Sequence, residues 1–192
     1  MSNISTTSAA VNSHQDWKSR GFGEAQIPIQ PGQKACLLRN WPTHETTDSD
    51  LATWDQAVMG VGVRGRWFPA VDADIEDQAV ADAVLQSAYD HFGYTPVRYG
   101  RRPRGLLPYR ADPDNPVPPM QVAFSLPNDP EGAKPHKIEI VADGKQWVAE
   151  ACHPDTGQPY EWPAGRPDAN TLPTVDEPSL RRWLDVTARR LE

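Results

Sequence analysis

Trp67-Phe68-Pro69-Ala70-Val71-Asp72-Ala73-Asp74 leads an apolar run directly into two aspartates that are two residues apart. Side chains alternate between the two faces of a β-strand, so Asp72 and Asp74 point the same way, roughly 6–7 Å apart at their Cα atoms. Carboxylates this close repel each other unless a cation lies between them. Hard divalent ions such as Mg²⁺ are commonly held by one or two carboxylates together with substrate phosphates. Two interpretations of the pattern stay open: half of a metal site for phosphoryl or nucleotidyl transfer, and the commoner one, in which Asp74 merely starts the turn before a helix.

Composition limits the classes of protein that this chain can represent. Its 192 residues suit one domain, or one domain with a small appendage. A net charge of −7 excludes a globally basic nucleic-acid coat, so any such contact needs a local patch. Cys36 and Cys152 lack zinc-site spacing and are expected to be reduced thiols. The polar first 16 residues and the lack of an 18-residue apolar run predict a soluble, cytoplasmic protein with no membrane partner.

The secondary-structure signals around the quoted stretch predict an α+β fold, a mostly antiparallel sheet with helices packed on its faces. Strands over 61–64 and 67–72 are expected to form a tight hairpin at Gly65-Arg66, and Asp143-Gly144 predicts a second hairpin. Periodic apolar residues predict a helix over 76–91. Further strands are expected over 25–29, 96–99, 106–110, 120–126, 137–141 and 146–149, and helices over 13–20, 51–58 and 177–191.

Three other segments carry side chains suited to phosphate chemistry. Glu139, in a strand between two isoleucines, faces away from them and would join the two aspartates if the strands are neighbours. The segment 98–110 is rich in arginine, which binds phosphate bidentately, and Tyr99 and Tyr109 within it are candidates for base stacking. His153 follows a strand and can donate to a phosphate or assist proton transfer. Each segment also has a purely structural interpretation: a solvated acid, a charged hairpin tip and an incidental loop histidine.

Taken in order, these segments resemble the bifunctional primase–polymerase domain of the archaeo-eukaryotic primase superfamily, in the form found in phage and plasmid replication proteins. The resemblance runs from about Gly21 to Trp162. Ala70-Val71-Asp72-Ala73-Asp74 is similar to the first acidic motif of that family. The segment from Pro96 to Arg110 resembles the second, nucleotide-handling motif, and Lys137-Ile138-Glu139-Ile140 with the segment from His153 to Trp162 resembles the third and its sequel.

The resemblance implies a primase-like α+β fold, in which an antiparallel sheet module of RRM-like character packs against helices and a smaller α/β module. Residues 1–12 are rich in Ser, Thr, Asn and Ala and are expected to be disordered. The catalytic domain is expected at 13–165, followed by a connector with a C-terminal helix at 166–192. The resemblance also implies site residues of three kinds: two Mg²⁺ or Mn²⁺ ions on Asp72, Asp74 and Glu139; nucleotide binding by Arg98, Arg101, Arg104, Arg110 and His153; and nucleic-acid contacts by Arg102 and Tyr99.

The activity implied by the resemblance is template-directed nucleotidyl transfer in the replication of mobile DNA. Its partners would be a single-stranded DNA template, dNTP or NTP substrates, and a helicase region or replication partner. The basic segment lacks the Ser-x-His pair that the family often has there, so arginine would bind the phosphates instead. Two alternatives stay open: a metal-dependent nuclease, and a nucleotide- or single-strand-binding module with weak catalysis.

Overall fold

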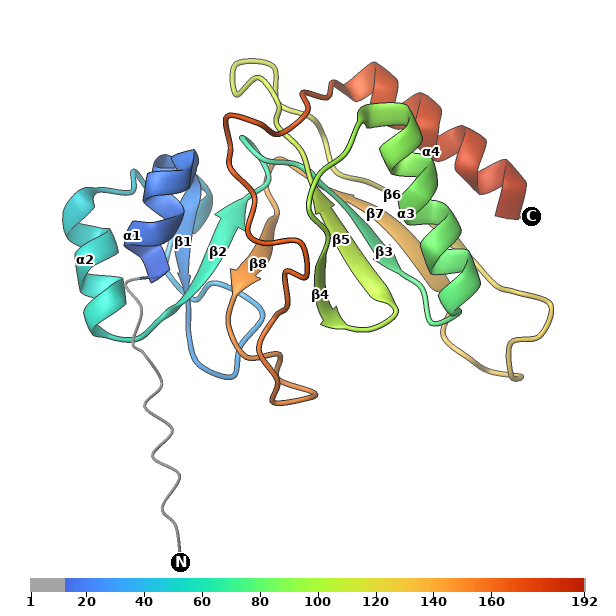
Figure 1. Ribbon diagram of the computed structural model, residues 1–192, viewed down its shortest axis with the longest axis horizontal. Helices are drawn as coiled ribbons and strands as arrows, with labels where there is room; N and C mark the ends of the chain where they lie inside the picture. The colour runs from blue at the N-terminus through green and yellow to red at the C-terminus, as the bar shows by residue number, and fades with distance from the viewer. Residues whose placement is uncertain (1–12, 192) are drawn as a thin grey trace, which may run out of the picture.

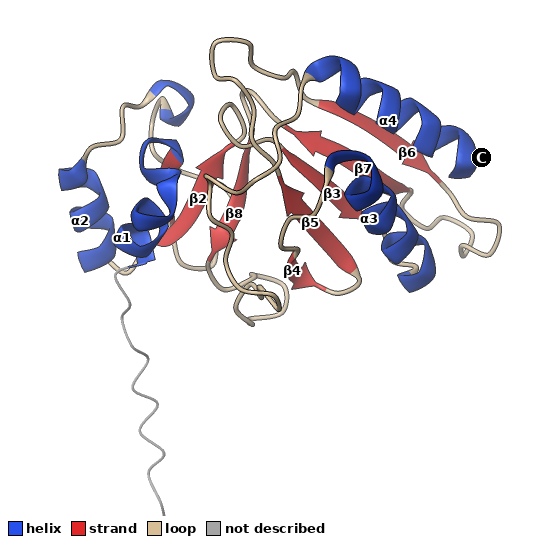
Figure 2. Cartoon of the chain, turned by 45° about the horizontal axis from the view of Figure 1, so that its top comes forward, coloured by secondary structure: helices blue, strands red, loops and turns tan. Residues whose placement is uncertain are grey.

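The strands form two separate antiparallel sheets, as the computed structural model of residues 13–191 shows (Figures 1 and 2). The smaller sheet has the order β1-β2-β8, and the larger has the order β4-β5-β3-β7-β6. The strands are β1 (Gln26–Ile29), β2 (Gly60–Arg64), β3 (Ala70–Asp74), β4 (Arg98–Arg101), β5 (Arg104–Pro108), β6 (Met120–Phe124), β7 (His136–Val141) and β8 (Gln146–Glu150).

Each of the two sheets has its own set of covering helices. In Figure 1 the long helices lie together on one face of the larger sheet, and the two short ones lie beside the smaller sheet. The α-helices are α1 (Ser13–Trp17), α2 (Asp48–Gln56), α3 (Gln78–Phe92) and α4 (Glu177–Leu191). A π-helical turn, Lys18–Phe22, follows α1 and bends at Gly21, whose φ of 86° favours glycine.

Strand β3 sits at the centre of the larger sheet and divides its residues between two apolar clusters. Val71 and Ala73 point toward α3 and α4 and are fully buried there with Ile138 and Ile140 of β7. Ala70 points the other way, into the cluster between the two sheets. We call this cluster the seam; it contains Val61, Val63, Ala70, Leu106, Val141 and Trp147. The alternation of a strand thus gives β3 one helix-covered face and one face toward the smaller sheet.

Both predicted hairpins are wrong, because the chain changes sheet at each of them. Strand β2 pairs with β1 and β8, whereas β3 pairs with β5 and β7. The two crossings lie side by side: Gly65 N–H donates to the Lys145 carbonyl at 2.9 Å. A Cβ at Gly65 would overlap the main chain of Ala142, so glycine is required for this approach. The chain does turn at both positions, but the turn residues do not specify which strands pair.

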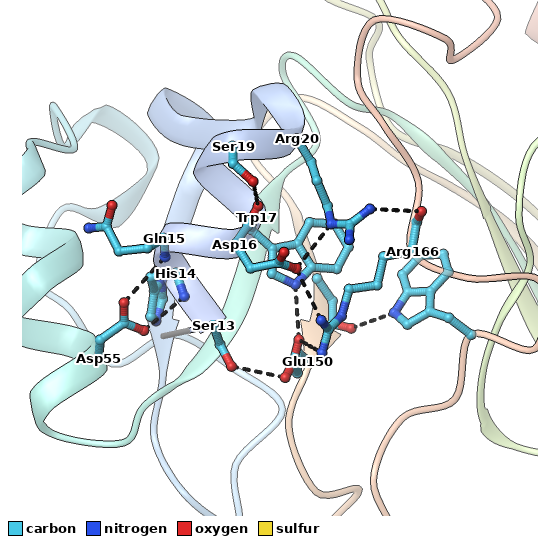
Figure 3. Close-up of polar contacts among 12 residues, drawn as sticks. Ser13, His14, Gln15, Asp16, Trp17, Ser19, Arg20, Asp55, Glu150 and Arg166 are labelled. Atoms are coloured by element: carbon cyan, nitrogen blue, oxygen red, sulfur yellow. Dashed lines mark hydrogen bonds and ion pairs between the residues drawn. The ribbon is translucent and has the colours of Figure 1, made fainter. Parts of the chain in front are cut away.

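A network of polar contacts fastens α1 and the connector to the end of β8 (Figure 3). The Glu150 carboxylate accepts hydrogen bonds from Ser13 Oγ at 2.9 Å and Trp17 Nε1 at 3.0 Å, and it pairs with Arg166 at 2.8 Å. Arg166 also pairs with Asp16 at 3.0 Å. Because Trp17 is fully buried, its indole N–H depends on this carboxylate for its only protein acceptor among the described residues.

The α+β prediction is confirmed, as are the terminal helix over 177–191 and the edge position of β1. Leu180, Trp183, Leu184 and Thr187 form the buried face of α4, as the periodicity indicated. The disorder predicted for residues 1–12 falls outside the described residues. Within residues 13–191 no helix is long and apolar enough to cross a membrane.

Replacement of Glu150 by alanine is expected to lower the free energy of unfolding by about 2 kcal/mol, because it leaves the buried Trp17 indole and Arg166 without their acceptor. The control is Glu177→Ala, which removes an exposed ion pair with Arg181 and should cost less than about 1 kcal/mol. Urea denaturation with an unchanged m-value would measure both. Equal losses in the two variants would contradict the role assigned to Glu150.

Candidate active site

The face of the larger sheet that meets the seam changes from apolar to charged along β3. Ala70 pairs with Val141, whereas Asp72 pairs with Glu139 and Asp74 with Lys137. Directly opposed residues of an antiparallel pair share a face. The smaller sheet covers the apolar end of β3, and the carboxylates lie where that cover stops.

Asp72 is the most perturbed carboxyl group of this face. Burial raises the pKa of Asp72 to about 6; Arg98 opposes the rise, and the charges of Asp74 and Glu139 add to it. Within residues 13–191 its carboxylate has neither a hydrogen bond nor an ion pair, although both of its acidic neighbours do. A half-buried carboxylate beside two others, with no partner of its own, is suited to bind a cation.

The other two carboxylates are neutralised by basic side chains. Asp74 pairs with Arg104 at 2.5 Å. Glu139 pairs with Lys137 at 2.6 Å through one oxygen and with Lys145 through the other. Burial opposes ionisation of Glu139, but the two lysines outweigh it and lower the pKa of this carboxyl. Across residues 13–191 no group of three His, Cys, Asp or Glu side chains is arranged to hold a metal ion.

Asp72 and Asp74 therefore fit a divalent ion, and Glu139 does not join them as it stands. Lys137 and Lys145 occupy both of its oxygens, so either lysine would have to release Glu139 before it could act as a ligand. The three carboxylates predicted to converge do share one face and neighbouring strands. Only the first two are open toward the same pocket.

Six of the predicted site residues line one pocket, which has a volume of about 180 Å³. We call it the Asp72 pocket. Its lining consists of two carboxylates, four basic side chains from one loop and strands β4 and β5, a histidine, a tyrosine and a glycine: Lys34, Asp72, Asp74, Arg98, Gly100, Arg101, Arg104, His153 and Tyr160. Segments from both sheets thus close over the carboxylates, and the excess of basic groups suits an anionic ligand.

Arg98 connects the two sheets beside Asp72. Its guanidinium donates to the Val148 carbonyl of β8 and lies over the Tyr160 ring, 4.6 Å from the centroid. Arg98 is buried and shares a face with Leu106 and Asp72 through the strand register. It therefore supplies a fixed positive charge at the floor of the pocket.

His153 lies against β4 because position 100 is glycine. A Cβ at Gly100 would overlap the Tyr160 ring and lie 2.9 Å from His153 Cδ2. His153 Nδ1 accepts from the Asp155 backbone N–H at 3.3 Å. Burial and the charge of Lys34 lower the pKa of His153, which favours the neutral ring. A neutral imidazole that accepts at Nδ1 carries its proton on Nε2, so His153 is set up as a hydrogen-bond donor.

Arg101 and Arg104 share an anionic partner that the sequence analysis did not identify. Both guanidinium groups donate to Glu76 Oε1, and Arg104 also holds Asp74. Glu76 follows β3 directly, and its backbone N–H donates to His136 Nδ1 at 3.1 Å. Two arginines on one carboxylate leave donors free to turn toward a phosphate.

The remaining predicted residues lie elsewhere. Arg102 is exposed above Tyr99, 3.7 Å from the ring centroid, and pairs with Glu161 at 3.4 Å. A base could stack on Tyr99 from that side only if Arg102 moved. Tyr109 is fully buried in the core below α3, so the stacking role considered for it is wrong. Arg110 lines a different pocket from the Asp72 pocket.

Four neighbours of the site were not predicted from the sequence as functional residues: Lys34, Tyr160, Lys145 and Glu76. Lys34 pairs with Asp155 at 2.9 Å and brings the turn after β1 to the rim of the pocket. Each is a single residue in a loop or at a strand end, without periodic context. Only the two-sheet arrangement brings them together.

A family model described as the bifunctional DNA primase/polymerase, N-terminal domain matches residues 18–177. The chain belongs to this family. The matched range includes both sheets, α2, α3 and every residue of the Asp72 pocket. A search of curated proteins finds no match to the chain. Membership in the primase/polymerase family supports a nucleotidyltransferase-type enzyme with a general role in DNA replication.

The raised pKa of Asp72 in this primase/polymerase domain predicts a pH-dependent effect of Asp72→Asn on stability. The folded pKa of about 6 lies above the ordinary 3.8, so the wild type loses stability as pH rises between these values. Asparagine does not titrate. We compare the free energy of unfolding of the variant with that of the wild type, without added metal. We expect this difference to be more favourable to the variant at pH 8 than at pH 4.5, by on the order of 2 kcal/mol.

Chemical denaturation at the two pH values measures this difference. Asp82→Asn, an exposed carboxylate on α3 that accepts from Gln78, is the matched control and should show no such pH dependence. A pH-independent effect of Asp72→Asn would show that the pKa of Asp72 is the same in the folded and the unfolded chain, and would contradict the effect of burial assigned to it.

Proposed function

We propose that this domain catalyses template-directed nucleotidyl transfer, as a DNA polymerase and primase, with two Mg²⁺ or Mn²⁺ ions. The observation that carries the proposal is the convergence of Asp72, Asp74 and three arginines on one pocket. Family membership supports the general class of activity. The proposed partners are a single-stranded DNA template, dNTP or NTP substrates, and a helicase region or replication partner.

Asp72 and Asp74 would hold the metal ions, with Glu139 as a third ligand after exchange of a lysine. Bound divalent ions would supply acidification of the attacking 3′-hydroxyl and neutralisation of the pyrophosphate charge. Asp72 must be ionised to act as a metal ligand, and its pKa of about 6 leaves it mostly ionised at pH 7. No protein nucleophile is needed for this reaction.

The basic side chains of the pocket would bind and orient the triphosphate. Arg98 is fixed by Val148 and Tyr160 and provides charge that needs no reorganisation. Arg101 and Arg104 are half-exposed at the rim and can exchange Glu76 for phosphate oxygens. His153, with its proton on Nε2, would donate to a phosphate oxygen without adding net charge.

Primer extension tests the proposal, on a single-stranded template with dNTPs or NTPs and Mg²⁺ or Mn²⁺. We expect the wild type to lengthen a labelled primer, and Asp72→Asn and Asp74→Asn to lose at least about a hundredfold of the rate, as removal of transition-state electrostatics generally does. Asp82→Asn, on the helix-covered side, is the control. Products formed without a primer would establish priming.

Two other outcomes would overturn the polymerase assignment. Metal-dependent shortening of the primer would identify a nuclease that uses the same carboxylates. Nucleotide or DNA binding without any change of the primer, equal in the wild type and in Asp72→Asn, would identify a binding module.

The shared contact of Glu76 with Arg101 and Arg104 predicts that this carboxylate competes with the triphosphate. We expect Glu76→Gln to bind a dNTP about fivefold more tightly in the absence of metal, the equivalent of roughly 1 kcal/mol for an exposed ion pair. Isothermal titration calorimetry measures the affinity, with Glu45→Gln as an exposed control outside the pocket. Weaker binding by Glu76→Gln would mean that Glu76 orients the arginines instead.

A further inference from the structure

A second pocket lies at the other end of the seam. Its volume is about 350 Å³, and it is enclosed by the turn after α1, the crossing between β2 and β3, the segment after β5 and the connector. We call it the Trp67 pocket. Its lining includes Glu24, Trp67, Phe68, Arg110 and Asn170.

The same two strands connect this pocket to the Asp72 pocket. Trp67 and Phe68 precede β3, which ends at Asp74; Arg110 follows β5, which begins at Arg104. Four to seven residues of extended chain separate the two linings along β3 and six separate them along β5, or roughly 13–23 Å. A ligand in the Trp67 pocket therefore cannot be the nucleotide held by Asp72 and Arg104.

Trp67 has the features of a stacking platform. It is half-buried, and the Arg64 guanidinium lies 4.5 Å from the centre of its ring. Arg64 is itself buried and held by the carbonyl groups of Glu24 and His44, so it fixes the indole from one side. Among residues 13–191 Trp67 forms no ring pair with another aromatic side chain, whereas Trp17, Trp147 and Trp162 contact one another in edge-on or tilted pairs.

Arg110 supplies a cation with a fixed backbone and an unengaged side chain. Its N–H donates to the Pro173 carbonyl at 3.0 Å, and its carbonyl accepts from Val175 at 2.8 Å. Its exposed guanidinium makes no hydrogen bond or ion pair within the described residues 13–191. An arginine anchored in this way retains all five donors for an external anion.

The polar side chains of Glu24 and Asn170 complete the pocket. Glu24 is exposed, and its carboxylate has no partner in the part of the chain that the structure describes. A carboxylate accepts from the ring N–H and amino groups at the edge of a nucleobase, and it opposes more than one nearby phosphate charge. The set of an aromatic platform, one arginine and one carboxylate suits a base with a single phosphate.

We propose that the Trp67 pocket binds one unpaired nucleotide, with its base on Trp67 and its phosphate on Arg110. Two sources share this chemistry: a residue of a single-stranded nucleic acid, or a free nucleoside monophosphate. Base stacking on an aromatic side chain tolerates any sequence, and arginine positions the backbone. The site is separate from the proposed active site and does not depend on its metal ligands.

The test measures binding of a labelled single-stranded DNA by fluorescence anisotropy, without divalent metal and over a range of salt. We expect Arg110→Gln to weaken binding about tenfold and to reduce the salt slope by about one. Arg189→Gln, an exposed arginine on α4, removes the same charge outside the pocket and should leave both unchanged. The readout is binding alone, without divalent metal, so a failed polymerase assignment leaves this test intact.

Trp67→Leu separates stacking from charge. We expect a loss of about tenfold or more on an intact strand, with an unchanged salt slope. On a strand with abasic sites, Trp67→Leu should have no further effect, whereas Arg110→Gln should still weaken binding. Arg110→Gln removes no packing, so it decides the question even if Trp67→Leu fails to fold.

The same variants tested with a deoxynucleoside monophosphate identify the source of the ligand. A loss confined to the strand assigns the pocket to nucleic acid, and a loss confined to the monophosphate assigns it to a free nucleotide; either result supports the site. Equal affinity and salt slope for wild type, Arg110→Gln and Arg189→Gln with both probes would overturn the proposal.

Discussion

The close approach of two chain crossings at Gly65 and Ala142 is the constraint on which the rest of this structure depends. Their main chains lie too near each other for a Cβ at position 65, and the Gly65 N–H donates to Lys145. Because the chain passes between the two sheets at this point, from β2 to β3 and from β7 to β8, the smaller sheet covers only the first part of β3. Apolar residues lie under that cover, and the carboxylates begin where it stops. The acidic face is therefore half-buried as a direct result of how the two sheets are arranged.

Carboxylates on a half-buried face destabilise the fold unless basic side chains neutralise them. Lys137, Lys145 and Arg104 neutralise Glu139 and Asp74, and Arg98 partly offsets the burial of Asp72. The remaining strain is concentrated on Asp72, whose raised pKa records that the ionised form is disfavoured in the folded chain. A disfavoured charge that is not relieved by a partner is typical of functional sites, where stability is reduced in favour of binding.

The sequence predicted the parts of this fold that follow from local periodicity and failed where pairing is decided at long range. Alternation along 70–74 and the apolar face of 177–191 are local properties, and both are confirmed. Gly65-Arg66 and Asp143-Gly144 have hairpin composition, but a turn fixes the direction of the chain and not the sheet that it joins. Arg110 looked like part of the basic segment because it is near in sequence, yet β5 carries it roughly 20 Å from Arg104. Glu76 belongs to no local pattern, and the Pro-Gly-x-Lys turn that contains Lys34 does not specify which site it reaches, since a single charged residue in a loop carries no information about its neighbours.

The net charge of −7 has a consequence for how this domain would retain a nucleic acid. A domain with a negative long-range field cannot depend on electrostatic attraction alone, so affinity has to come from contacts at short range. Arginines paired with carboxylates, as at Glu76, give little net field until the pairing is exchanged for phosphate. An arginine beside an aromatic ring, as at Arg110 and Trp67, combines one phosphate contact with stacking that salt does not screen. Both arrangements place the binding energy in the pockets at the two ends of β3 and β5, whose rigid strands then set the spacing between the nucleotides that each pocket would hold.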